Sequence, residues 1–387
     1  MNETKIRVSA GPHHRHQCPM IARIPWSGEA PPPLFGIVDL TANHTSHAQL
    51  LPWLAAEGEI CFAWILDDLA PNHAREFLLT PQPPAEHAGV ELIEAGAGRI
   101  EVHMDGDLFT AYNFGAELAR PNLHPLRGPG GRHMTRDYPM AEGPQGESRD
   151  HIHHRSLWVA HGDVNGADNW SEGSGHARTV HRSFSRREAG PAMAVLEAQS
   201  DWVTAAGERL LEERRLMTFY HLPATWRCLD LEVELRPARG EVRFGDTKEG
   251  GICAVRVASS MDASGEGRIE NSYGGIDEAE TWGKRAHWCD YSGPVRGEIV
   301  GIAVFDHPHS FRHPTYWHVR DYGLMTANPF GLSHFYSDPT RDGSHLLKPG
   351  EKMWFRYRIY VHLGDAPAGA VTEKYHDFIN PPRLELA

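Results

Sequence analysis

Short segments in which apolar and polar residues alternate recur along the chain, and they constrain its fold more than any other feature. The clearest is LDLEVEL at residues 229–235, where four aliphatic side chains fall on one side of an extended chain and three carboxylates on the other. This pattern is typical of antiparallel strands with one face in the core and one in solvent. Similar segments lie at residues 90–93, 99–103, 298–305 and 353–362. The sequence therefore predicts an all-β protein.

The length of 387 residues allows more than one structural unit. Residues 80–89, TPQPPAEHAG, are rich in proline and small residues and predict a boundary. We expect a small N-terminal β-rich unit over residues 1–80 and a large antiparallel β-sandwich over residues 81–387 that carries the site. Helical patterns are weak and confined to residues 45–57 and 370–378. No glycine fingerprint follows a strand, which disfavours a dinucleotide-binding fold.

Charge and hydropathy narrow the choice of partners. The chain has 38 basic and 51 acidic residues, and no run of Lys or Arg could follow a phosphate backbone, so we expect no nucleic acid partner. The N-terminal residues lack a signal-peptide pattern, and no window approaches 18 uninterrupted apolar residues. We therefore expect a cytoplasmic protein with no membrane partner. Five scattered cysteines predict buried thiols. The sequence leaves the oligomeric state open.

The 26 histidines are the unusual part of the composition, and four of them lie in residues 150–170, DHIHHRSLWVAHGDVNGADNW. If residues 151–160 form a strand, His151, His153 and Arg155 point to one side and His154 to the other. With His161 or Asp163 as a third ligand, His151 and His153 are a possible site for a divalent metal. The alternative is that these imidazoles hydrogen-bond a polyol or one another.

The GDVNG segment at residues 162–166 has the composition of a turn. Asp163 and Asn165 either bond their own backbone there or hold the hydroxyl groups of a ligand. Trp158 and Trp170 lie close by in the sequence and offer flat surfaces for a sugar ring.

Two further segments carry groups suited to proton transfer. GDTKEGG at residues 245–251 places Lys248 beside Glu249, which form either a surface ion pair or an acid–base pair if the backbone turns there. In residues 306–331 strand alternation puts His318 and Arg320 on one face, where they could clamp an anion or a polarised carbonyl. The remaining candidates for substrate binding are His133, Arg136, Arg155, Trp158, His161, Trp288 and Asn328.

Several motifs are absent. There is no G-x-S-x-G, phosphate loop, H-E-x-x-H or C-x-x-C, so esterase, NTPase, zincin and thioredoxin chemistry have no support in the sequence.

The segments RPNLHPLRGPGG, HHRSLWVAHGDVNGADNW, DTKEGG and PTYWHVRDYGLMTANPFG together resemble a bacterial family labelled "methane oxygenase PmoA". Ile152 departs from the proline expected in that family. The resemblance implies an association with sugar-catabolic oxidoreductases, and its label implies a metal-dependent oxygenase. LKPGE at residues 347–351 before an amphipathic strand is similar to the galactose-mutarotase-like super-sandwich. The catalytic Glu of mutarotases has no counterpart in residues 326–330, so only that fold is implied.

We therefore expect an enzyme that acts on a sugar or an oxidised sugar derivative by acid–base chemistry, as a lyase, hydrolase or epimerase. Its candidate catalytic residues are His153, His154, Lys248, Glu249 and His318. One alternative is a metal-dependent enzyme, such as an oxygenase, that uses His151, His153 and His161. The other is a carbohydrate-binding protein without catalytic activity. A small carbohydrate is the expected ligand in the first and last of these.

Overall fold

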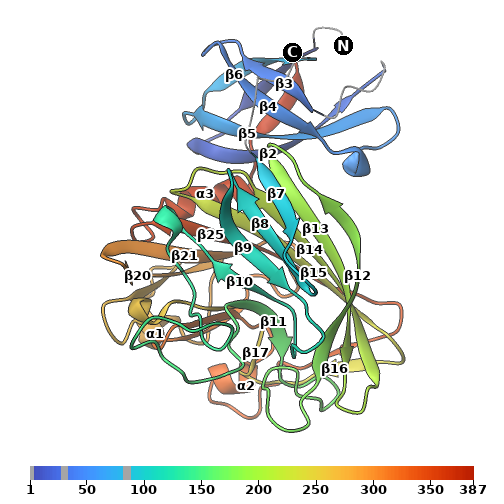
Figure 1. Cartoon of the computed structure of the whole chain (residues 1–387), viewed down its shortest axis with the longest axis vertical. Coiled ribbons are helices and arrows are strands. Elements are labelled where there is room, and N and C mark those ends of the chain that lie inside the picture. Colours follow the sequence, from blue (N-terminus) through green and yellow to red (C-terminus); the bar gives the residue numbers. More distant parts are fainter. Residues whose placement is uncertain (1–3, 28–33, 82–88) are drawn as a thin grey trace.

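The computed structural model describes residues 4–27, 34–81 and 89–387, and its strands pair in antiparallel fashion throughout. Three large sheets dominate the structure (Figure 1). The predicted all-β class, with a large sandwich and a small N-terminal β unit, is confirmed. Among the described residues, no helix has the length and apolar character needed to cross a bilayer.

The N-terminal sheet has seven strands. In spatial order these are β2 (Arg15–Pro25), β5 (Glu59–Leu69), β4 (His44–Leu50), β3 (Leu34–Asp39), β6 (Ala74–Thr80), β1 (Thr4–Ser9) and β26 (Arg383–Leu386). The last strand comes from the C-terminal end of the chain and pairs with β1. Residues 82–88, most of the predicted boundary, lie outside the described residues, so the division at residue 80 stays a prediction.

The body is a sandwich of a nine-stranded and an eight-stranded sheet. The first contains β19 (Lys284–Arg285), β22 (Tyr316–Arg320), β23 (Leu324–Ala327), β17 (Gly250–Arg256), β11 (Leu157–His161), β10 (Asn122–Leu126), β9 (Asp107–Asn113), β8 (Arg99–Met104) and β7 (Val90–Glu94). The second contains β12 (Arg178–Glu188), β13 (Met193–Val203), β14 (Arg209–Tyr220), β15 (Arg227–Pro237), β25 (Met353–Leu363), β21 (Glu298–Asp306), β20 (Trp288–Val295) and β18 (Arg268–Asn271). A small ribbon pairs β16 (Val242–Phe244) with β24 (His345–Leu347).

Helices are few and short. The α-helices are α1 (Asp277–Thr281), α2 (Leu332–Phe335) and α3 (Val371–Ile379), and the 3₁₀ turns are η1 (Pro52–Leu54), η2 (Pro129–Gly131) and η3 (Ser259–Met261). The helix predicted at residues 370–378 is confirmed as α3. The helix predicted at residues 45–57 is wrong, because β4 pairs there with β3 and β5 and only the turn at Pro52 is helical.

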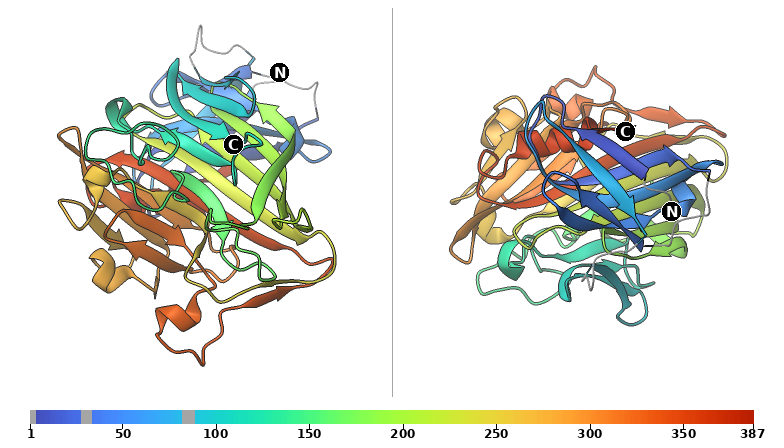
Figure 2. Two further views of the ribbon diagram at one scale, coloured as in Figure 1. Left: turned by 60° about the horizontal axis from the view of Figure 1, so that its bottom comes forward. Right: turned by 90° about the horizontal axis from the view of Figure 1, so that it is seen from above.

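The LDLEVEL segment lies in β15, and its aliphatic side chains belong to the core between the two sheets of the body. The alternation predicted that the other face of this strand is open to solvent, and the structure shows instead that it is covered. Asp230 is 2% exposed and accepts a hydrogen bond of 2.6 Å from Arg358 Nε, and Phe378 of α3 covers that guanidinium. A separate apolar cluster joins the N-terminal sheet to the body. The right view of Figure 2 looks down through the N-terminal strands onto the body. The outer face of β15 is therefore an internal junction.

Candidate functional site

A cavity of about 490 Å³ opens on the outer face of the nine-stranded sheet, among the loops brought forward in the left view of Figure 2. In β22, Trp317 and Val319 point into the core, so His318 points outward to the cavity. The predicted common face of His318 and Arg320 is confirmed, since both line this cavity. The full lining consists of His151, His153, His154, Gly162, Asp168, Trp170, Ser171, Thr247, Lys248, Glu249, His318, Arg320 and Tyr322.

Residues 151–156 do not form the strand on which the histidine pattern was interpreted. His151 and Ser156 have φ angles of 42° and 63°, and β11 begins only at Leu157. The expected separation of His154 from the other two is therefore wrong. The ring centroid of His154 lies 4.7 Å from that of His151 and 4.6 Å from that of His153. The three imidazoles form one packed cluster at the cavity wall.

His154 has a fixed tautomer. Arg256 Nη1 donates a hydrogen bond of 3.0 Å to His154 Nδ1, and a guanidinium cannot accept one. His154 Nδ1 must therefore carry a lone pair, which leaves the proton on Nε2. Burial, assisted by the positive charge of Arg256, holds the pKa of His154 well below its usual value, so this imidazole is neutral at pH 7.

His318 has the opposite tautomer. Its Nδ1 lies 2.7 Å from the carbonyl oxygen of Lys248 and donates its proton there, because a carbonyl can only accept. Within the described part of the chain no hydrogen bond reaches Nε2 of His318, so the lone pair of that atom has no partner there. Burial lowers the pKa of His318 to about 3. His318 therefore presents an unprotonated nitrogen at neutral pH.

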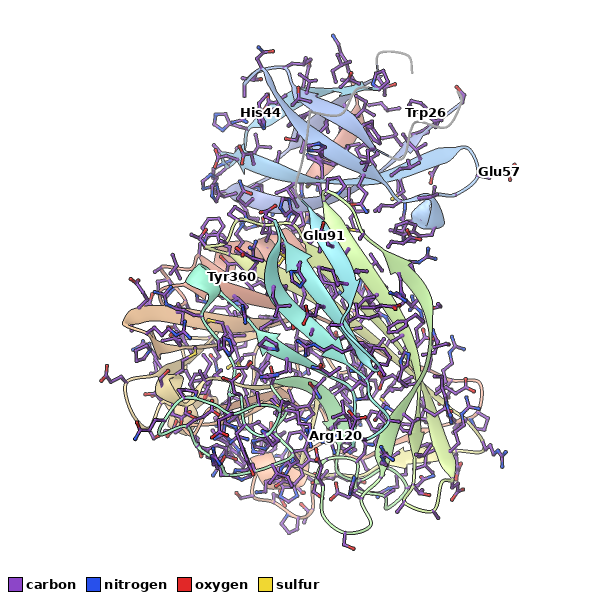
Figure 3. The ribbon with its side chains drawn as sticks, viewed as in Figure 1. Trp26, His44, Glu57, Glu91, Arg120 and Tyr360 are labelled. Atoms are coloured by element: carbon purple, nitrogen blue, oxygen red, sulfur yellow. The ribbon has the colours of Figure 1, made fainter. Side chains whose placement is uncertain are left out.

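His153 is the third neutral imidazole of the cavity. Burial and the charge of Arg120 lower its pKa to about 4. Arg120 donates to Glu172 Oε1 at 2.9 Å, and Arg155 binds both oxygens of the same carboxylate. Arg155 is thereby committed to an internal ion pair beside the site. Arg120, which is labelled in Figure 3, lies in the lower half of the body, away from the N-terminal sheet.

The loop before β17 brings Lys248 and Glu249 to the cavity together. The backbone bends there, so adjacent side chains need not face opposite ways, and Lys248 Nζ lies 3.2 Å from Glu249 Oε1. Asn328 is fully buried and donates to the carbonyls of Thr247 and Lys248 at 2.9 and 3.1 Å. Asn328 thus acts on the loop and does not line the cavity.

The residues of GDVNG form the plain turn that was one of its two interpretations. Asp163 Oδ1 accepts from Gly166 N at 2.8 Å, and Asn165 Oδ1 accepts from Arg243 N at 2.7 Å. Trp158 is 1% exposed and lies beneath the ring of His154, with the centroids 5.4 Å apart. It supports the cavity wall from below and offers no surface to a ligand.

Three other candidates lie away from this cavity. Trp288 packs in the cluster between the N-terminal sheet and the body. His133 lines a separate cavity of about 690 Å³, where it binds Asp137 at 2.9 Å. Arg136 is buried behind the site and donates to Asp150 and to the carbonyl oxygen of His151, at 2.9 Å for the latter. That last bond helps to set the backbone of His151.

The predicted metal set of His151, His153 and His161 is not brought together. His161 is fully buried, donates from Nε2 to Gly245 O at 3.0 Å, and packs against Phe244 and Phe330. Within residues 4–27, 34–81 and 89–387, no group of three or more His, Cys, Asp or Glu side chains is arranged to hold a metal ion.

Several residues of the site were not predicted from the sequence. Asp168 and Tyr322 line the cavity and lie within polar segments that the sequence marks, whereas Ser171 lies one residue beyond such a segment. Arg256 could not be found in this way, because it ends the otherwise apolar strand β17 and meets His154 only in the folded chain.

Two solved structures similar to this chain are a protein in glycosyl hydrolase family 38 and an alpha-mannosidase, both from Enterococcus faecalis. Each has a TM-score of 0.46 and 10% sequence identity, and the matches cover 100% of this chain but 47% and 46% of those chains. This chain thus spans about half the length of either, and likeness at this level carries no function. No curated protein matches.

The family comparison corrects the resemblance drawn from the sequence motifs. The matching family model is not labelled as a methane oxygenase, so the assignment to the family labelled PmoA is wrong, and the oxygenase activity implied by that label loses its basis. The model covers residues 99–376, well over half of the chain, and is described as a family of unknown function. The chain therefore belongs to that family, designated DUF6807.

Proposed function

We propose that this protein is an enzyme that acts on a sugar or an oxidised sugar derivative by general acid–base catalysis, with His318 as the base. The observation that carries the proposal is the tautomer of His318, a residue that lines the cavity: its Nδ1 is bonded to Lys248 O, which leaves the lone pair on Nε2. A neutral imidazole held in one tautomer is suited to removing a proton from a hydroxyl group, from water or from a carbon beside a carbonyl.

The surrounding groups would supply the other functions that the proposed reaction needs. The Nε2–H of His154 would donate a hydrogen bond to an oxygen of the substrate that gains negative charge. Lys248 and Glu249 would return a proton to the leaving or re-forming group. Tyr322 supplies an aromatic wall for the apolar face of a sugar ring. This mixture of donors, acceptors and aromatic rings suits a polyol better than an apolar ligand.

The test is to incubate the protein with sugars, ketosugars and sugar acids in D₂O and to follow them by NMR. A lyase or an epimerase would exchange hydrogen for deuterium at one carbon, and a hydrolase would release a new anomeric signal. His318→Asn keeps a donor near Lys248 O and removes Nε2, so we expect conversion to fall by about 10²-fold or more with little change in the melting temperature.

His309→Asn is the matched control, because His309 lies exposed in the same segment and outside the cavity. It should leave conversion unchanged. Full activity in His318→Asn would reject His318 as the base. Binding of a sugar by the wild-type protein without conversion of any compound would instead identify a carbohydrate-binding protein.

A further inference from the structure

Arg155 and Arg358 each hold a carboxylate by the same edge of the guanidinium, which carries Nε and Nη2. In Arg155, Nε and Nη2 bind the two oxygens of Glu172 at 2.6 and 2.5 Å. In Arg358, the same two nitrogens bind Asp230 at 2.6 and 3.1 Å. This planar, two-point pairing is the strongest that a guanidinium makes with a carboxylate.

Arg320 has the same edge without a protein carboxylate on it. Only Nη1 is paired, with Glu278 Oε1 at 3.2 Å. Nε is buried and has no hydrogen-bond partner, and no described residue contacts Nη2 by a hydrogen bond. A buried donor without a partner is unfavourable, because it has lost its hydrogen bonds to water. Because Arg320 lines the cavity, a ligand can supply the missing acceptor.

The acidic groups of the cavity are already engaged elsewhere. Asp168 accepts from the backbone of Trp170 and Ser171 at 2.8 and 2.9 Å. Glu249 pairs with Lys248. Neither carboxylate contacts Arg320, so they do not satisfy its open edge.

We propose that the substrate of this site carries a carboxylate, and that the Nε and Nη2 edge of Arg320 binds it. The proposal rests on the proposed function and narrows it to sugar acids, such as uronates and aldonates. His318 lies two residues earlier on the same face of β22, about 7 Å away along the strand. A carboxylate on Arg320 would therefore bring the neighbouring carbons of the sugar acid toward the base.

The test compares the binding of three sugar acids with that of their neutral parents, by calorimetry on the full chain. The probes are D-glucuronate, D-galacturonate and D-gluconate against D-glucose, D-galactose and D-glucitol. We expect at least one acid to bind about tenfold or more tightly than its neutral parent. Equal binding of each pair, or no binding by any acid, would overturn the proposal.

Three variants locate the carboxylate. Arg320→Gln should remove the preference for the acid, whereas Glu278→Gln should preserve or increase it, because a neutral amide competes less for the guanidinium. Arg243→Gln, in an exposed arginine of β16, is the control and should bind as the wild type does. An unchanged preference in Arg320→Gln would overturn the assignment even if sugar acids bind.

Inorganic phosphate separates a sugar-acid site from a general anion site. Phosphate that binds as tightly as the best acid, and is lost in Arg320→Gln, would overturn the carboxylate assignment. The proposal about binding and the proposal about catalysis can be rejected separately. Sugar acids that bind through Arg320 but are never converted would reject the catalytic role, and conversion of neutral sugars alone through His318 would reject the carboxylate.

Discussion

His154 and His318 hold their single protons on opposite ring nitrogens, and each tautomer is fixed by one contact. ¹⁵N NMR of the imidazoles should find His154 protonated at Nε2 and His318 at Nδ1, unchanged from about pH 8 to about pH 5, because burial lowers both pKa values below their usual value near 6.5. Arg256→Met removes the donor to His154 Nδ1 and should give a mixed tautomer there. His318 serves as the internal control. A proton on His154 Nδ1 in the wild-type protein would refute this network.

At the residue scale, the sequence could indicate which side chains belong to the site but not which of their atoms carry protons. Strand alternation correctly placed His318 and Arg320 on one face. The same rule failed at His151, because its backbone takes a left-handed conformation that a bond from Arg136 helps to hold. The partner of His154 lies 102 residues away in sequence, and that of His318 lies 70 residues away. No local pattern reports contacts of that range.

At the element scale, the loop of residues 245–249 depends on Asn328 for its position. Asn328→Ala leaves the carbonyl of Thr247 without its donor and removes one of three donors to the carbonyl of Lys248, which keeps His318 Nδ1 and Gly250 N. We expect a loss of about 2 kcal/mol in the free energy of unfolding. Hydrogen exchange should rise in residues 246–250. Thr326→Val is the matched control, because it removes one bond to Gly250 O and none to the loop carbonyls. Equal exchange of the loop in both variants would contradict this role of Asn328.

Strands were predictable where alternation is regular, as in β15 and β25, because every second side chain enters the same core. The error at residues 45–57 has a physical reason. An apolar run of that length fits a helix or a strand, and pairing with β3 and β5 decided between them. The burial of Asp230 beneath α3 could not be predicted from the sequence either, because its partner Arg358 is 128 residues away in sequence.

At the scale of the whole molecule, the two ends of the chain meet in the N-terminal sheet, where β26 pairs with β1. Arg15 of β2 binds Asp377 of α3 at 3.0 Å, and both side chains are 2% exposed. The sequence correctly predicted that the chain is rich in β-strands. It could not indicate that the C-terminal segment returns to the first sheet, because strand pairing over such a distance leaves no local signature.

The same burial that keeps the imidazoles neutral makes the stability of the whole protein depend on pH. Burial lowers the pKa of His161 to about 4 and that of His318 to about 3, whereas the unfolded chain takes up these protons near pH 6.5. Between these values the unfolded state binds more protons, so the free energy of unfolding falls as the pH falls from about 6.5 to about 4. Each buried histidine contributes at most about 1.4 kcal/mol per pH unit. Asp262 opposes this, because burial raises its pKa to about 6 and the folded state gains that proton first.

Urea denaturation at about pH 7, 6 and 5 measures this dependence. Carboxylates with lowered pKa values, such as Asp137, lose their contribution only below about pH 4, so the histidines dominate over this range. His318→Asn should make the dependence shallower, because one neutral buried imidazole is gone, while His309→Asn should leave it as in the wild type. If the free energy of unfolding stays constant from pH 7 to pH 5, or if His318→Asn leaves the slope unchanged, His318 is not held neutral by burial.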